Sequence, residues 1–186
     1  MFEALTPIAA MILVSSSAIV GALVSLFTKL EMSLYRHQIE KWRVFAGSVL
    51  LLAVLIISFN MIFIPALAIG IAAGFLIFKK DRVNYNWIVL GALLGLALAF
   101  NSALGFAAAM LVSVYNFLYA TVLNIPLVLK KKKFLKARLA EQIVFLAAAA
   151  ASYLLMFWQQ GNLSGFALYF AAGLLVVLLI KEIKHI

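Results

Sequence analysis

Hydrophobic residues run along this chain in five long stretches, separated by short polar or basic segments. A helix that crosses a bilayer needs about 20 apolar residues, with a range of about 17–25. Two of the apolar regions are too long for one span, so we divide them at Asn60 with Pro65 and at Asn101-Ser102. The pattern then predicts transmembrane helices at roughly 7–28, 44–59, 61–78, 85–101, 103–128, 138–158 and 163–180. The fold class we expect is therefore an all-α integral membrane protein, with about seven transmembrane helices in a single domain, 1–186.

Composition points to the same class of protein. The chain is 67% hydrophobic and 11% charged, whereas soluble domains carry about 25% charged residues. We therefore expect a multi-pass protein of the cell membrane. The absence of cysteine excludes disulfides and thiolate metal sites. No Lys or Arg precedes the first apolar stretch, so this stretch is interpreted as a retained helix and not as a signal peptide.

All 15 Lys and Arg residues fall in the segments that follow the first, third, fifth and seventh predicted helices. Cytoplasmic loops are enriched in these residues, so the pattern places the N-terminus outside and the C-terminus in the cytoplasm. The lysine run (Lys130, Lys131, Lys132 and Lys133) then marks the cytoplasmic side and contacts anionic lipid headgroups. Specific binding of a phosphate-bearing partner is the alternative. Nucleic acid is not expected, because the charges lie along a membrane face. The segment 29–45 has the pattern of a short interfacial amphipathic helix.

Two similar motifs predict an internal repeat. The chain reads AAMILVS at 9–15 and AAMLVS at 108–113, and each copy begins a set of three helices with a basic linker. The repeats would be 7–80 and 106–182, joined by a linker helix at 85–101, in a parallel 3+1+3 arrangement about an axis along the membrane normal. This helix count and orientation resemble those of SWEET-type sugar transporters and of trimeric intracellular cation channels. The chain lacks the signature motifs of both families, so no residue roles are transferred.

Charged chemistry is sparse in the predicted spans. None of the six acidic residues falls at the middle of a span, which argues against a proton-coupled pump with a buried carboxylate. His37 and Glu40 share a helix face, but two ligands do not make a metal site. No catalytic motif is present, so we expect no catalytic residue, metal or cofactor. An enzyme is disfavoured, although a lipid enzyme assembled from scattered residues stays open.

Neutral polar residues near the middle of two helices form the candidate substrate site: Ser16, Ser17, Tyr115, Asn116 and Tyr119. In hydrocarbon a polar group needs a partner, so we expect these side chains to face the interior and to converge on one cavity near the midplane. The alternative is that they join helices by hydrogen bonds.

Small residues predict close helix packing. Gly70 and Gly74 form one Gly-x-x-x-Gly pair, and Gly91 and Gly95 form another. Such pairs let two backbones approach closely, either within one chain or between the chains of a homo-oligomer or a larger complex. The leading function is a permease or channel for a neutral or weakly charged small solute. The alternative is a non-catalytic membrane subunit or assembly factor of a larger membrane complex.

Overall fold

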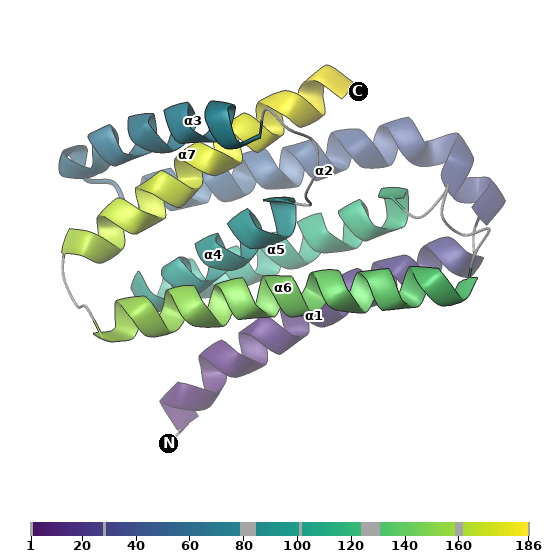
Figure 1. Ribbon diagram of the computed structural model, residues 1–186, viewed down its shortest axis with the longest axis horizontal. Helices are drawn as coiled ribbons and strands as arrows, with labels where there is room; N and C mark the ends of the chain where they lie inside the picture. Colours follow the sequence, from purple (N-terminus) through teal and green to yellow (C-terminus); the bar gives the residue numbers. More distant parts are fainter. Residues whose placement is uncertain are drawn as a thin grey trace.

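A computed structural model describes the backbone of residues 2–27, 29–78, 85–100, 102–123, 131–158 and 162–185. Side chains are described for 6–25, 34–78, 85–100, 103–121, 139–156 and 163–184. These residues form seven α-helices, one short 3-10 helix and no strand (Figure 1). The elements are α1 (Phe2–Phe27), α2 (Lys29–Ile57), η1 (Met61–Phe63), α3 (Ile64–Ile77), α4 (Tyr85–Phe100), α5 (Ser102–Leu123), α6 (Lys131–Trp158) and α7 (Asn162–His185). The all-helical class and the seven helices are confirmed for this part of the chain.

The predicted break near Asn60 is present. Helix α2 ends at Ile57, and the side-chain Oδ1 of Asn60 accepts a hydrogen bond of 3.0 Å from the backbone nitrogen of Ile62. This contact caps η1, and Pro65 then lies at the first turn of α3. Proline has no backbone N–H and is tolerated at this position. Local capping therefore divides the long apolar region in two.

Three helices are longer than the apolar stretches that predict them. Helix α2 begins at Lys29 and includes the predicted interfacial segment, so that segment is the first part of one continuous helix. Helix α6 begins at Lys131, and α7 continues to His185. None of these three helices contains proline, so nothing in the backbone interrupts their hydrogen bonding. Apolar length predicts the part of a helix that suits hydrocarbon, and the helix itself extends into the charged segments.

Helix α4 forms the centre of the bundle. Nine of its 16 residues are buried, and it packs against α5, α6 and α7. Helix α1 packs on α5, α2 packs on α5 and α7, and α3 packs on α7. A helix that is apolar all round is typical of a buried position or of a membrane span, which agrees with the absence of a polar face on α4. At about 1.5 Å per residue it is about 24 Å long, shorter than the hydrocarbon core of about 30 Å.

Among the residues that the structure describes, four helical segments are long and apolar enough to cross a membrane: Thr6–Ser25, Ala103–Thr121, Leu139–Met156 and Leu163–Lys184. Met61–Ile77 and Tyr85–Phe100 are shorter apolar helical segments. Figure 1 shows consecutive helices running in opposite directions, so that the starts of α2 and α6 and the end of α7 lie at one end of the bundle. We call this end the basic end, because Lys29, Lys131 and Lys184 belong to those helix termini.

Candidate functional site

The serines of α1 are hydrogen-bonded within their own helix. The hydroxyls of Ser16 and Ser17 donate to the carbonyls of Leu13 and Val14, at 2.7 and 2.6 Å within the same helix. Ser16 is exposed and Ser17 is half-buried, so the expectation that both face the interior is wrong for Ser16. Successive helical residues are about 100° apart around the axis, and consecutive serines therefore cannot all face inward.

The candidate residues of α5 are buried. Tyr115 is 1% exposed, Asn116 is 0% and Tyr119 is 8%. The rings of Tyr115 and Tyr119 stack with centroids 6.1 Å apart, because residues four apart lie on the same face of a helix. The structure therefore brings the two tyrosines together and leaves Ser16 outside the group.

A buried ion pair lies beside these tyrosines. Arg43 of α2 and Glu182 of α7 are both buried, with Nε and Oε2 at 3.3 Å. The other carboxylate oxygen, Oε1, accepts a hydrogen bond from the Tyr115 hydroxyl and one of 3.4 Å from the Asn86 amide of α4. One carboxylate thus joins four helices, at the end of α7 that belongs to the basic end of the bundle.

Aromatic rings surround the ion pair. The guanidinium carbon of Arg43 lies 5.0 Å from the centroid of the Tyr119 ring, a distance typical of a cation–π contact. Trp87 of α4 meets the same ring edge-on, with centroids 5.2 Å apart. Gly47 of α2 lies against the Tyr115 ring, where an added Cβ would come within 3.3 Å of it. We call Arg43, Asn86, Tyr115 and Glu182, with the rings of Trp87 and Tyr119, the ion-pair cluster.

Two buried amides lack hydrogen-bond partners among the described residues. They are Asn116 of α5, which is 0% exposed, and Gln142 of α6, which is 3% exposed. Neither the nitrogen nor the oxygen of either side chain is bonded within that part of the chain. An unsatisfied buried polar group costs about 1–3 kcal/mol. Such groups in native proteins usually meet water or a ligand, which makes both amides candidates for contact with a polar solute.

The glycine pairs lie at contacts between helices of the same chain. A Cβ at Gly91 would come within 2.5 Å of the Phe145 carbonyl oxygen in α6, and one at Gly95 within 2.2 Å of that of Ala149. Gly70 lies equally close to the backbone of α7 at Phe170, and Gly74 lies against the Val177 side chain. These contacts bind α4 to α6 and α3 to α7, and no second chain is needed to explain them.

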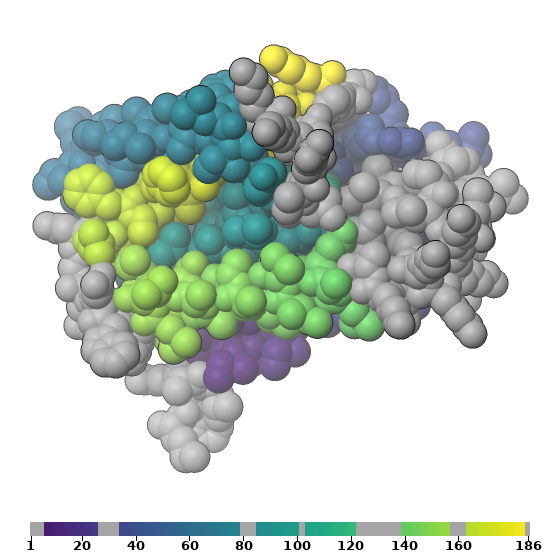
Figure 2. Space-filling view, viewed as in Figure 1, coloured from purple at the N-terminus to yellow at the C-terminus, as the bar shows by residue number. Residues whose placement is uncertain are grey.

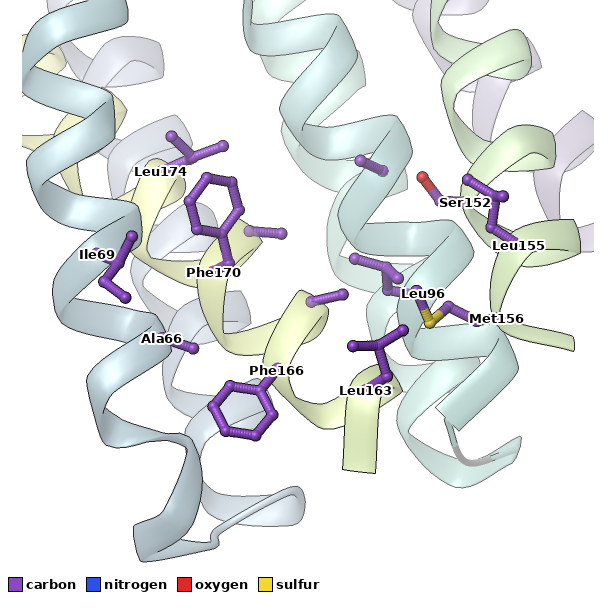
Figure 3. A pocket seen from close by; sticks show the side chains of 13 residues that line it. Ala66, Ile69, Leu96, Ser152, Leu155, Met156, Leu163, Phe166, Phe170 and Leu174 are labelled. Carbon is purple, nitrogen blue, oxygen red and sulfur yellow. The ribbon is translucent and has the colours of Figure 1, made fainter. Parts of the chain in front are cut away.

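An apolar groove of about 480 Å³ lies between α3, α4, α6 and α7. Figure 2 shows this face, with α6 below, α3 above and α7 between them at the left. In Figure 3, Phe166 and Phe170 of α7 and Ile69 of α3 line one side of the groove. Leu155 and Met156 of α6 line the other side. Ser152 supplies the one hydroxyl of the lining. The groove therefore suits hydrocarbon and not a polar solute.

The ion-pair cluster does not follow from the predicted spans, because Glu182 lies beyond the end of the span predicted at 163–180. The spacing of buried residues along α7 and α2 indicates that both charged side chains face the protein interior. Leu175, Leu178 and Glu182 lie on one buried stripe of α7, and Arg43, Ala46 and Leu50 lie on one buried stripe of α2. A charged residue that continues a buried stripe at i, i+3/4 and i+7 positions is expected to face the protein.

Neither the lysine run nor the comparisons with known proteins assign a function to the chain. The side chains of Lys130 to Lys133 lie outside the described residues. No group of three His, Asp or Glu side chains suited to a metal ion occurs in the described ranges. Comparison of the chain with protein-family models, with curated proteins and with solved structures gives no match. Function must therefore be argued from the geometry of the chain itself.

Proposed function

We propose that this protein is a small permease or channel of the cell membrane, with a path for a neutral or weakly charged small solute beside α5. The observation that carries the proposal is Asn116. Its amide is fully buried, and both of its polar atoms lack partners among the described residues. The adjacent residue, Tyr115, contacts the ion pair of Arg43 and Glu182. A solute or water at Asn116 would satisfy the amide, and the ion-pair cluster would stand at one end of that path.

Transport also requires a protein that spans the membrane. We propose seven transmembrane helices, with the N-terminus outside and the C-terminus in the cytoplasm. The orientation is supported by the basic end of the bundle, where α2 and α6 begin and α7 ends (Figure 1). The charge pattern supports it as well, because basic residues favour the cytoplasmic side. The 3+1+3 repeat, with α4 as the linker helix, remains part of the proposal.

The test replaces Asn116 by leucine, which has nearly the same shape. Purified protein is reconstituted into liposomes, and swelling is followed by light scattering under gradients of urea, glycerol, glucose or a carboxylate salt such as sodium gluconate. We expect at least one of these solutes to enter faster than in protein-free liposomes. Asn116→Leu should lower that rate about tenfold, because losing one hydrogen bond to the solute costs about 1–1.5 kcal/mol. Stability should be retained, because the amide gives up no bond to the described protein.

The matched control is Ser113→Ala on the same helix, where the hydroxyl donates to its own helix at the Ala109 carbonyl. This variant should transport at the wild-type rate. Equal rates for wild type and a folded Asn116→Leu protein would refute the path at Asn116. If no solute enters faster than in protein-free liposomes, the permease proposal itself fails.

The second candidate is a non-catalytic membrane subunit or assembly factor, and the groove between α3, α4, α6 and α7 favours it. A helix of another chain could occupy this groove, because the lining is apolar apart from Ser152. The test is Ala167→Trp, which fills the groove, compared with Ala147→Trp on the exposed face of α6. On native gels of solubilised membranes, Ala167→Trp alone should shift the protein from a larger assembly to the single chain. A single chain for the wild type would exclude this function.

A further inference from the structure

The carboxylate of Glu182 is enclosed by hydrogen-bond donors from three other helices. Its oxygens meet the guanidinium of Arg43 (α2), the amide of Asn86 (α4) and the hydroxyl of Tyr115 (α5). A guanidinium, an amide and a phenol together form a donor set that matches a carboxylate. Arginine stays charged in proteins, so this set always carries a positive charge. We call Arg43, Asn86 and Tyr115 the donor cradle.

The cradle is not saturated by Glu182. Arg43 Nε and Glu182 Oε2 lie within ion-pair distance at 3.3 Å, but neither atom makes an aligned hydrogen bond in the described part of the structure. The indole nitrogen of Trp87 is also buried without a partner among the described residues. Trp87 and Tyr119 form the aromatic wall beside Arg43. The contact of 3.3 Å between Arg43 Nε and Glu182 Oε2 is longer than the about 2.7–2.9 Å of a strong charge-assisted pair.

The position of Glu182 allows it to leave the cradle. It lies in the last turn of α7, and the next residues, Ile183 and Lys184, are exposed. Arg43 and Tyr115 lie well inside α2 and α5, where the helix on both sides fixes them. A rearrangement of one terminal turn would therefore free the cradle while its donors stay in place, although Lys181 would have to release the carbonyl of Phe78.

We infer that the donor cradle is a binding site for the carboxylate group of a small solute, and that the Glu182 carboxylate occupies this site in the present conformation as an internal competitor. This site rests on the proposed function for its physiological role. It identifies small carboxylates as the class of solute that the permease would carry. In this scheme a solute carboxylate displaces Glu182 toward the basic end of the bundle. Release of the solute lets Glu182 return, which closes the path at the cluster.

The experiment measures binding, not transport. Trp42→Phe with Trp158→Phe leaves Trp87 as the single tryptophan, and its fluorescence is titrated with acetate in detergent. Acetamide, which has nearly the same shape and no charge, is the control ligand. Glu182→Gln removes the competing charge and keeps the shape. If Glu182 occupies the cradle for nine-tenths of the time or more, the apparent Kd for acetate should fall about tenfold or more in this variant.

Three further variants complete the test. Tyr115→Phe and Asn86→Ala each remove one donor, and either should raise the apparent Kd for acetate when added to Glu182→Gln, where no competing carboxylate loses the same donor. Gln38→Ala should have no effect, because Gln38 is uncharged and lies on an exposed part of α2. An unchanged Kd in Glu182→Gln, or equal responses to acetate and acetamide, would overturn the inference. If Glu182→Gln does not fold, a wild-type protein that responds equally to acetate and acetamide would overturn it instead.

The two proposals fail separately. Acetate that binds to the cradle of a protein without solute flux would remove the permease proposal and leave the carboxylate site. Flux that depends on Asn116, without acetate binding at the cradle, would keep the permease and remove the carboxylate site.

Discussion

Gly70 of α3 and Gly173 of α7 lie directly against each other. A Cβ added at Gly173 would come within 2.9 Å of the Gly70 carbonyl carbon and within 2.4 Å of the Leu67 carbonyl oxygen. A Cβ at Gly70 would come within 2.2 Å of the Phe170 carbonyl oxygen. Because each glycine faces the backbone of the other helix, both positions exclude any side chain unless the helices separate. This contact holds α3 against α7. Helix α3 has only 14 residues and therefore offers little surface for other contacts.

We predict that Gly70→Val destabilises the protein by about 1–3 kcal/mol or more, because overpacking of a close contact forces the backbones apart. Ala72→Val on the exposed face of the same helix is the control and should change stability little. Loss of helical circular dichroism on heating in detergent measures both. Equal melting of the two variants would show that α3 and α7 do not pack this closely.

The buried pair of Arg43 and Glu182 predicts strong coupling between two mutations. Arg43→Leu or Glu182→Leu alone should cost about 3–5 kcal/mol, because each leaves an unpaired buried charge. The double variant should cost clearly less than the sum of the two. Arg36 and Glu40, an i, i+4 pair at 3.0 Å on α2 in which Arg36 is exposed and Glu40 half-buried, serve as the comparison cycle, with an expected coupling of about 0.3–0.5 kcal/mol. Additive effects at Arg43 and Glu182 would contradict the pairing.

Tyr169 holds the turn between α2 and η1. Its hydroxyl donates to the Ser58 carbonyl at 3.0 Å and accepts from the Asn60 backbone nitrogen at 3.2 Å. Tyr169→Phe should therefore lower the free energy of unfolding by about 1–3 kcal/mol, because two buried backbone groups lose their partner. Tyr35→Phe, on an exposed part of α2, should be neutral. Chemical denaturation in detergent compares the two, and a neutral Tyr169→Phe would show that these backbone groups are satisfied otherwise.

The proposed orientation predicts the accessibility of two introduced cysteines. The natural chain has none, so Gly161→Cys and Lys132→Cys each give a single thiol. In sealed right-side-out vesicles, an impermeant maleimide should label Gly161→Cys and should label Lys132→Cys only after the vesicles are opened. Labelling of both thiols from the same side would contradict the seven-span arrangement.

The candidate site was less predictable than the helices. Arg43 and Glu182 are far apart in the sequence, and nothing local indicates that they meet. The serine run was misjudged at Ser16, because its hydroxyl is satisfied by the carbonyl of Leu13 in the same helix and can face outward. Tyr115 and Asn116 stand out in the sequence as polar residues of an apolar helix, but their neighbours follow only from the packing of α2, α4 and α7 around α5.

The sequence alone determined the number of helices and the points where they break, because apolar length and capping residues such as Asn60 act over a few neighbouring positions. It also determined the membrane class, through composition. Only the tertiary structure decided that Gly70 faces Gly173, that Gly91 and Gly95 face α6, and that Glu182 turns inward to Arg43. Contacts of this kind depend on which faces of distant helices meet, and in an almost uniformly apolar chain many pairings bury similar surface. Close backbone approach at glycines and the pairing of the few buried charges select among them.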